Sequence, residues 1–273
     1  MPDVSHGIIH IETRLIFIVL FYIIEYMRVS IITITYNSAT TLPNTLRSVE
    51  TQNYTDIEHI IVDGASTDGT LSIIQAYARG KSYVRYVSEK DAGIYNAINK
   101  GIGLATGDVI GILNSDDVLA SPDTIATIVK AFSDANAQVV YGDLVYCNTT
   151  GSVVRYWHSN TFRRSSLKFG WMPAHPTFYC LRSVYDEMGK YDETFRISAD
   201  YDFMLRVLMR PYHIMYVPEI LVRMSMGGAS NRNCHALLSK SCEDVRALHN
   251  NHVGAGVVTV FLKNVRKIRQ FLR

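Results

Sequence analysis

Two adjacent carboxylates, Asp116 and Asp117, follow an apolar run at residues 109–113 in the segment VIGILNSDDVLA. Like charges side by side repel each other, and burying them beside a strand costs free energy. Mg²⁺ and Mn²⁺ prefer carboxylate oxygens and often bind one or two carboxylates together with substrate phosphates. A divalent cation would offset the repulsion, so the pair is a candidate metal site. Asn, Ser and Asp also form turns, so a plain turn is the alternative.

A second acidic pair, Asp200 and Asp202, lies in RISADYDFMLRVL, at the start of a helix expected over residues 200–208. A carboxylate in a partly desolvated cleft can act as a general base and take a proton from a hydroxyl group. The helix dipole alone also favours acidic residues in a first turn, so the pattern leaves both interpretations open. His175, in PAHPTFY, could contact a substrate or serve only the fold.

The elements that must position these residues alternate between strand and helix in the first half of the chain. Apolar, β-branched strands are expected at residues 29–36, 59–62, 84–87 and 109–113, with helices between them. This alternation favours a parallel sheet with helices on both faces, and such sheets bind ligands outside the carboxyl ends of their strands. Four polar loops are therefore expected to meet at one crevice; they contain Tyr36-Asn37, Asp63-Gly64, Glu89 to Asp91, and Asp116-Asp117.

The second half of the chain is less regular. A helix is expected over residues 121–132, and strands over 139–146, 153–157 and 214–224. The pattern favours a mixed α+β half that packs on the first half and supplies the other wall of the crevice. Asp143, within the strand expected at 139–146, is a candidate to face a substrate bound in the crevice.

Composition and missing motifs exclude several classes of protein. The chain has 273 residues, is 48% hydrophobic and 19% charged, and has a net charge of +2, which is too small to suggest a nucleic-acid partner. Its four cysteines form no CxxC pair, so a zinc site is not expected. Neither GxGxxG nor GxxxxGK[ST] follows the first strand, which disfavours a Rossmann dehydrogenase and a P-loop enzyme. A bound diphosphate would need another positive charge, and a metal ion is the obvious source.

Both ends of the chain carry apolar segments. The ten residues at 15–24 are too few for a spanning helix, which needs ~20, so residues 1–26 are expected to be a hydrophobic extension or the product of an upstream start. The segment VVTVFLKNVRKIRQFLR predicts a basic amphipathic helix that lies on an anionic membrane surface. The alternative is a terminal helix packed on the body of the protein. The apolar face would comprise Val257, Phe261, Val265, Ile268 and Leu272.

Three blocks, VSIITITYNS, VDGASTDGT and SEKDAGIYNAINKGIGLATGDVIGILNSDDVL, resemble family 2 glycosyltransferases, and the likeness spans about residues 27–230. It is strongest to bacterial enzymes of colanic-acid and other surface-polysaccharide or glycolipid pathways. The resemblance implies the GT-A fold, with a Rossmann-like, mostly parallel central sheet. It also implies a nucleotide-binding half over residues 27–118, an acceptor half over 119–230 and a helical region over 231–273. The implied reaction moves a sugar, with inversion, from a nucleotide diphosphate sugar to a hydroxyl group of a glycan or lipid-linked acceptor.

The resemblance also implies roles for individual residues. Asp63 would accept the imide N–H of uracil, which makes a UDP-sugar the expected donor, and Asp200 would be the base. Asp117, together with Asp116, would hold Mn²⁺ or Mg²⁺. Asp202, Arg206 and His175 would support the reaction. Donor binding is expected from Thr35, Tyr36, Asp63, Asp91, Asn99, Lys100 and Asp116.

Departures from the family pattern and two alternative functions complete the expectations. Asn96 stands where relatives usually have Asp, and Ala199 where Glu is common. A non-catalytic nucleotide-sugar-binding protein is one alternative. A sugar-phosphate nucleotidyltransferase is another, although the glycine-rich, arginine-containing loop of that class is missing after the first strand. The expected location is the cytoplasm, either free or peripheral on the inner face of the membrane.

Overall fold

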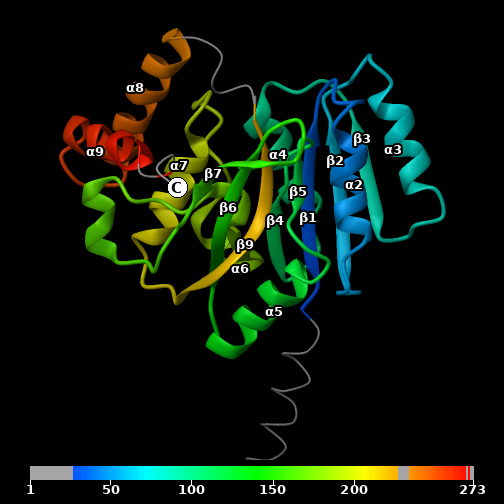
Figure 1. The fold of residues 1–273 in the computed structure, drawn as a ribbon, viewed down its shortest axis with the longest axis horizontal. Helices are drawn as coiled ribbons and strands as arrows, with labels where there is room; N and C mark the ends of the chain where they lie inside the picture. The colour runs from blue at the N-terminus through cyan, green and yellow to red at the C-terminus, as the bar shows by residue number, and fades with distance from the viewer. Residues whose placement is uncertain (1–26, 227–233, 269, 271–273) are drawn as a thin grey trace, which may run out of the picture.

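Nine strands form the central sheet of the computed structural model, which describes residues 27–226, 234–268 and 270. The extension expected at residues 1–26 lies outside the described residues. The strands are β1 (Val29–Thr35), β2 (Ile57–Asp63), β3 (Val84–Ser88), β4 (Val109–Ile112), β5 (Asp117–Leu119), β6 (Val139–Cys147), β7 (Val153–Trp157), β8 (Tyr179–Leu181) and β9 (Ile214–Ser225). Their order is β3-β2-β1-β4-β8-β6-β9-β5, and β7 pairs with β6 beside this path (Figure 1).

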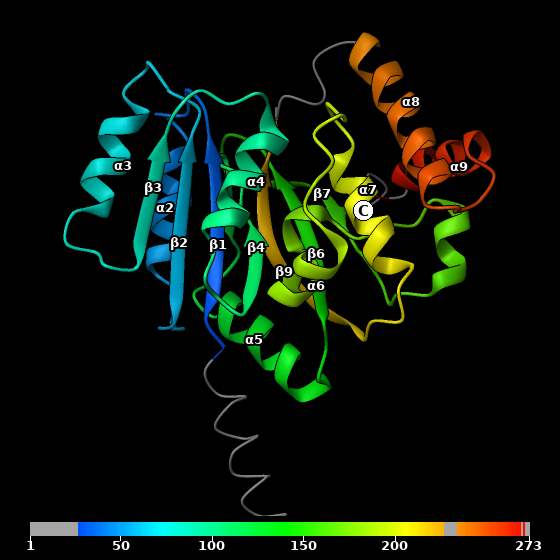
Figure 2. The same ribbon diagram turned by 180° about the vertical axis from the view of Figure 1, so that it is seen from behind.

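Helices cover both faces of this sheet. They are α2 (Leu42–Glu50), α3 (Thr70–Ala78), α4 (Ile94–Leu104), α5 (Thr124–Ala135), α6 (Arg182–Met188), α7 (Ala199–Leu208), α8 (Cys234–Asn250) and α9 (Val257–Ile268), with 3-10 turns η1 (Arg164–Phe169) and η2 (His175–Thr177). Figure 2 shows α4, α6 and α7 in front of the sheet, while α2 and α5 lie on the face seen in Figure 1. None of the helices in the described residues has the length and hydropathy that a membrane span requires.

The parallel half of the sheet owes its position to burial on both faces. On β1, Ile32 and Ile34 point into the core that α4 and α7 cover, and Ile31 points into the core that α2 and α5 cover. Parallel strands buried on both sides appear in a sequence as nearly continuous apolar runs, so their positions could be predicted. The predicted parallel arrangement is confirmed, because β1 pairs in parallel with β2 and β4, and β2 with β3.

Asp117 lies in a strand where the sequence suggested a loop. It begins β5, which runs antiparallel to β9 and places Asp117 opposite Met224. This pairing joins segments about a hundred residues apart in the chain, and no local pattern announces it. The strand fixes the backbone of Asp117, whereas Asp116 stays in the preceding turn.

The register between β6 and β9 shifts next to Asp143. Tyr141 pairs with Tyr216, but Asp143 pairs with Ile220, so β9 carries extra residues between these two positions. Pro218 lies in that interval and has no N–H to donate to the ladder. Irregular pairing of this kind changes the direction of nearby side chains. The strand expected over residues 214–224 is therefore continuous, and a shift of register accommodates Pro218.

Candidate active site

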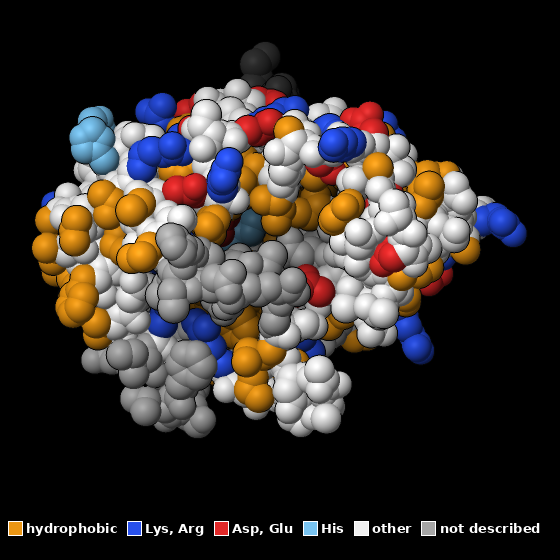
Figure 3. All heavy atoms as spheres, turned by 90° about the horizontal axis from the view of Figure 1, so that it is seen from above, with side chains coloured by type: hydrophobic (Ala, Val, Ile, Leu, Met, Phe, Trp, Pro, Cys, Tyr) orange, Lys and Arg blue, Asp and Glu red, His pale blue; other side chains and the backbone are white. Residues whose placement is uncertain are grey.

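The loops that follow the parallel strands meet at one edge of the sheet, as predicted. A Cβ atom added to Gly64 would lie 3.1 Å from Asp91 Oδ2 and 3.3 Å from Tyr36 Cδ2, so three loops touch at this glycine. The loop after β4 joins them, because Ser115 Oγ lies 2.9 Å from Ser38 Oγ. Figure 3 looks onto this edge, where the surface is hollowed between the two halves of the molecule. Tyr36 is 65% exposed and open to a ligand.

Asp63 ends β2 beneath these loops and is fully buried. Its carboxylate accepts hydrogen bonds from the Ser66 backbone and hydroxyl, and from Ser88 Oγ at 2.6 Å. The neighbouring Thr35 hydroxyl is buried and has no hydrogen-bond partner among the described residues. Contact between Asp63 and a nucleotide base therefore requires the serines to give up the carboxylate, and this role stays a prediction.

Asp91 and Lys100 form an ion pair in the same loop cluster. Lys100 Nζ lies 2.6 Å from Asp91 Oδ1 and 2.8 Å from Glu89 Oε1. The hydrogen bond to Asp91, followed by that to Glu89, raises the pKa of Lys100, so its positive charge is kept beside the exposed Tyr36 loop.

Asn99 faces the other half of the molecule. Its amide nitrogen donates to the Tyr191 carbonyl at 2.9 Å and to Glu193 Oε1 at 2.8 Å, and its oxygen accepts from the Tyr191 N–H. These bonds hold α4 against the segment that precedes α7. Asn99 is thus part of the seam between the halves, and its expected contact with a donor stays a prediction.

Asp117 is fully buried and its carboxylate is only half satisfied. Oδ2 accepts a hydrogen bond from Asn114 Nδ2 at 2.9 Å, while Oδ1 has no well-formed hydrogen bond. Burial, and then the negative charge of Asp116, raise the pKa of Asp117 to about 8, and contacts with Asn114 and the Ser225 backbone offset only part of this. Burial also raises the pKa of Asp116.

A divalent cation fits this pair of carboxylates. An unpaired buried oxygen is unfavourable, and a cation would supply its missing partner while stabilising the ionised form. Within the part of the chain that the structure describes, no three His, Cys, Asp or Glu side chains gather as a metal site. The protein would then offer two carboxylates and leave the other positions to phosphate oxygens and water, which is a common arrangement for Mg²⁺.

Asp200 lies partly buried in the first turn of α7, next to Tyr95 of α4 in the first half of the chain. Tyr95 of α4 donates a hydrogen bond to the Ile197 carbonyl at 2.6 Å and lies 3.2 Å from Asp200 Oδ1. His175 Nε2 lies 2.9 Å from Tyr191 Oη, and burial lowers the pKa of His175 although Asp200 opposes this. His175 is therefore mostly neutral near pH 7, and Asp200 sits among Tyr95, His175 and Tyr191.

Asp202 and Arg206 point away from Asp200 and join elements together. Arg206 Nε donates to Asp202 Oδ2 at 2.9 Å, and the guanidinium also donates to the carbonyls of Met188 and Lys190. The other oxygen of Asp202 accepts a hydrogen bond from Asn251, which directly follows α8. The pair ties α7 to α6 and α8, so its support of the reaction would be indirect.

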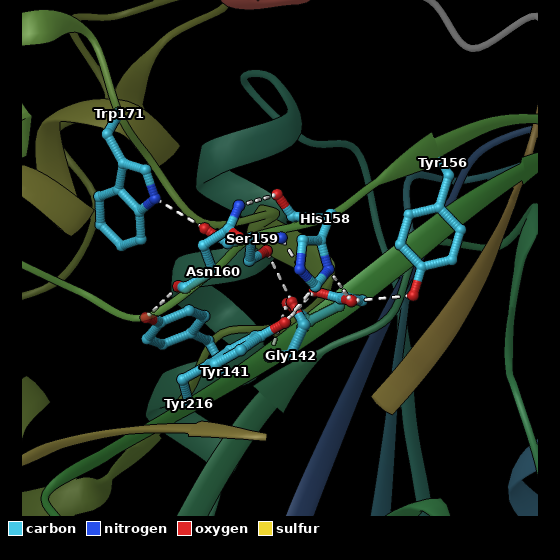
Figure 4. A network of polar contacts seen from close by, with 10 residues as sticks. Tyr141, Gly142, Tyr156, His158, Ser159, Asn160, Trp171 and Tyr216 are labelled. Carbon is cyan, nitrogen blue, oxygen red and sulfur yellow. Dashed lines mark hydrogen bonds and ion pairs between the residues drawn. The ribbon is translucent and has the colours of Figure 1, made fainter. Parts of the chain in front are cut away.

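A network around Asp143 contains residues that the sequence did not single out. The buried Asp143 carboxylate accepts hydrogen bonds from Tyr156, Tyr216, His158 Nδ1 and the Ser159 N–H, at 2.6 to 2.9 Å. Figure 4 shows these side chains converging from β6, β7, β9 and the segment after β7. A lone Asp in an apolar strand was the only signal in the sequence, because its partners come from other segments.

Comparisons with known proteins agree with this architecture. A family model described as glycosyl transferase family 2 matches residues 30–198. A PGL/p-HBAD biosynthesis glycosyltransferase of Mycobacterium tuberculosis is 31% identical over 207 residues, which is 74% of this chain and 78% of that protein. Among solved structures, S. aureus TarS in complex with UDP-GlcNAc has a TM-score of 0.63 at 16% identity, over 81% of this chain and 67% of that one. The mannosyltransferase PcManGT of Pyrobaculum calidifontis, in complex with GDP-Man and Mn²⁺, has a TM-score of 0.63 at 19% identity, over 90% and 72% of the two chains.

Proposed function

The chain belongs to glycosyltransferase family 2, and on that premise we propose that it transfers a sugar, with inversion, from a nucleotide diphosphate sugar to a hydroxyl group. The observation that carries this proposal is the buried carboxylate of Asp117, with its unpartnered oxygen, at the edge where the donor loops meet. A cation that binds a diphosphate would explain why this carboxylate is buried with one oxygen unpartnered.

The donor we propose is a UDP-sugar. Asp63 is the support for this choice, since a carboxylate at the end of β2 can accept the imide N–H of uracil. TarS was solved with UDP-GlcNAc and PcManGT with GDP-Man, so the fold accommodates both kinds of nucleotide. The exposed Tyr36 would cover the base, and Lys100 would place positive charge near the phosphates.

We propose that Asp117, with Asp116, holds Mn²⁺ or Mg²⁺. When bound, such an ion supplies Lewis-acid stabilisation to the departing nucleotide diphosphate. Asn114 donates to Oδ2 of Asp117 and thereby leaves Oδ1 as the oxygen that points to the cation. The finding that PcManGT was solved with Mn²⁺ supports a divalent cation in this fold.

We propose that Asp200 takes the proton from the acceptor hydroxyl. Tyr95 would orient it, because its hydroxyl group is anchored on the Ile197 carbonyl and also contacts Asp200 Oδ1. A neutral His175 beside Asp200 would not form an ion pair with it, so the carboxylate would stay available to accept a proton. General bases of this kind contribute about 10²- to 10⁴-fold to a rate.

We further propose that the protein is cytoplasmic and binds peripherally to the inner face of the membrane, where it would meet a lipid-linked acceptor of surface-polysaccharide or glycolipid synthesis. Helix α9 exposes Val257, Val258, Phe261 and Val265 and carries basic residues beside them. In Figure 3, hydrophobic side chains gather at the left edge of the molecule, the end formed by α8 and α9 in Figure 1. Helices with an apolar face and basic flanks bind anionic lipid surfaces.

The proposed function is tested by comparing Asp200→Asn with Asp186→Asn, an exposed acidic residue on α6. Donor binding is measured by thermal shift with nucleotide sugars and Mn²⁺, and transfer is measured with sugar and lipid-linked acceptors. We expect Asp200→Asn to bind donor as the wild type does but to transfer about 10²-fold more slowly or worse, because it lacks the base. Asp186→Asn should match the wild type.

Three results would count against the proposal. Full transfer activity in Asp200→Asn would remove its role as the base. Donor binding without turnover on any acceptor would favour a non-catalytic nucleotide-sugar-binding protein. Pyrophosphate release from a nucleoside triphosphate and a sugar phosphate would favour a nucleotidyltransferase.

A further inference from the structure

A pocket of about 210 Å³ lies between helix α9 and the segment that follows β7. It is separate from the loops that follow β1, β2, β3 and β4. Its aromatic walls are formed by Tyr156, Trp157 and Trp171. Figure 4 shows Trp171 on one side of this region and Tyr156 on the other, with His158 between them. The volume is below the range of roughly 300–1,000 Å³ for drug-sized ligands, which suits a single sugar or phosphoryl unit.

His158 is held in one orientation at this pocket. Its Nδ1 lies 2.6 Å from Asp143 Oδ2, and Asp143 is buried and fixed by Tyr156, Tyr216 and the Ser159 N–H. Nδ1 therefore donates to the carboxylate, and Nε2 is the nitrogen left for a ligand. In the neutral ring Nε2 then accepts a hydrogen bond, and a hydroxyl group of a ligand can supply it.

The pocket contains more positive than negative charge. Lys263, Arg266 and Lys267 of α9 line it. Lys263 is paired with Asp244 at 2.9 Å, but Asp244 also accepts from Ser198 and lies 3.8 Å from Lys240. The negative charge of Asp244 is therefore shared among several donors and compensates Lys263 only in part.

Lys267 differs from Lys263 in the nature of its hydrogen-bond partner. Its ammonium group contacts the amide oxygen of Asn264 at 3.3 Å, which is a neutral partner. Burial, and then the charge of Lys240, lower the pKa of Lys267, while Asp244 and Asp200 oppose this shift. An anion in the pocket would oppose this shift and stabilise the charged form of Lys267. Lys263 of the same pocket lies 3.3 Å from the centre of the ring of Tyr201, the residue that follows Asp200, so the pocket lies near the candidate base.

We propose that this pocket binds a phosphorylated sugar acceptor, with Lys267 and Arg266 as donors to the phosphate group and His158 Nε2 as an acceptor for a sugar hydroxyl. The proposal rests on the proposed glycosyltransferase function and defines the chemical class of its acceptor. Charge-assisted hydrogen bonds from lysine and arginine are the strong contacts for phosphate oxygens. The aromatic walls would pack against the apolar face of the attached sugar, while the nearby Asp200 would reach its hydroxyl group.

The proposal is tested by direct binding to the full chain, with glucose 1-phosphate, glucose and inorganic phosphate as probes in calorimetry. Vesicles of phosphatidylglycerol are a further probe, because a lipid headgroup presents the same phosphate chemistry. The variant is Lys267→Gln, and its matched control is Lys130→Gln, an exposed lysine on α5. We expect glucose 1-phosphate to bind at least about tenfold more tightly than glucose, and Lys267→Gln to lose about tenfold in this affinity.

Inorganic phosphate should bind more weakly than glucose 1-phosphate and compete with it, and Lys130→Gln should behave as the wild type. Equal affinity for glucose and glucose 1-phosphate, or equal behaviour of the two lysine variants, would overturn the proposal. The proposal would also be overturned if the protein did not bind glucose 1-phosphate and if vesicles displaced inorganic phosphate from it. The pocket would then be a site for a lipid headgroup. Metal-dependent hydrolysis of UDP-sugars by the wild type is measured in parallel. If the wild type hydrolysed no nucleotide sugar, this would count against the proposed function. The binding results test separately whether the pocket binds phosphate.

Discussion

Asp117 is buried without a full set of hydrogen bonds, and its own neighbour Asp116 repels it. Such a residue destabilises the metal-free protein whenever it is ionised. Because the pKa of Asp117 is about 8, the folded protein holds a proton that the unfolded chain loses near pH 3.9. The contribution of this group to stability is thus complete below pH 4 and is lost as the pH rises through about 8.

Asp117→Asn should remove this dependence on pH. Between pH 5 and pH 8 in a chelator, we expect the melting temperature of the wild type to fall by ~3 °C or more relative to that of the variant. Mn²⁺ added at pH 8 should raise the melting temperature of the wild type and leave that of Asp117→Asn unchanged, since the variant lacks the ligand. Thermal denaturation monitored by circular dichroism measures both effects. Parallel pH profiles for the two proteins would mean that Asp117 ionises normally and needs no cation.

At the scale of elements, helix α9 packs on the body with a side that includes two polar residues. Thr259, Val260 and Lys263 are buried, whereas Phe261 is 64% exposed and Val257 is 72% exposed. Lys263 can be buried because Asp244 of α8 neutralises it and its ammonium group lies 3.3 Å from the centre of the Tyr201 ring. The apolar face is left at the surface, where lipid would be a better solvent for it than water.

Phe261→Asp should therefore weaken membrane binding without unfolding the protein. We expect the variant to lose at least about tenfold in affinity for vesicles that contain phosphatidylglycerol, because it loses apolar burial and gains repulsion from the lipid. Co-sedimentation with vesicles measures this, and the melting temperature should stay within ~2 °C of the wild type since Phe261 has few contacts to lose. The control is Tyr86→Asp, at an exposed position on β3 at the far edge of the sheet. Similar losses in both variants would remove α9 as the membrane-binding element.

The same helix shows where sequence patterns stop being informative. The period of Val257, Phe261 and Val265 predicted an amphipathic helix, but it did not tell which side would face the protein. That choice depends on Asp244, a residue of another helix. The buried strands were predictable for the opposite reason, because Ile31 and Ile32 are both apolar and both faces of β1 are covered.

In the candidate site too, local patterns predicted some features, whereas contacts between distant segments could not be predicted. Convergence of the loops at Tyr36 and Asp91 followed from the rule for parallel sheets, and short local blocks indicated Asp117 and Asp200. The sequence did not indicate His158, because its role depends on Asp143 and a register shift between β6 and β9. It also gave no sign that Asn99 would bond to Tyr191 across the seam, since that contact joins residues 92 positions apart.

At the scale of the whole molecule, the C-terminal helices are joined to the site. The family match ends at residue 198, yet Glu243 of α8 accepts hydrogen bonds from three successive backbone N–H groups just before Asp200. They belong to Arg196, Ile197 and Ser198, at 2.9 to 3.0 Å. The Ile197 carbonyl in this segment in turn accepts from Tyr95. The segment that carries the proposed base is thus fixed by α4 on one side and by α8 on the other.

Glu243→Ala should therefore impair both stability and transfer, although Glu243 touches neither donor nor metal. Three charge-assisted hydrogen bonds are lost and water replaces part of them, so we expect the free energy of unfolding to fall by about 1–3 kcal/mol. We expect kcat for transfer to fall by about tenfold while donor affinity is kept, because a small displacement of Asp200 disturbs proton transfer more than donor binding. Urea denaturation and steady-state kinetics measure the two effects, with Glu219→Ala as the exposed control on β9. Glu243→Gln should recover part of both losses, since an amide oxygen can still accept some of these bonds. If Glu243→Ala lost stability but kept wild-type kcat, α8 would support the fold alone and the placement of Asp200 would not depend on it.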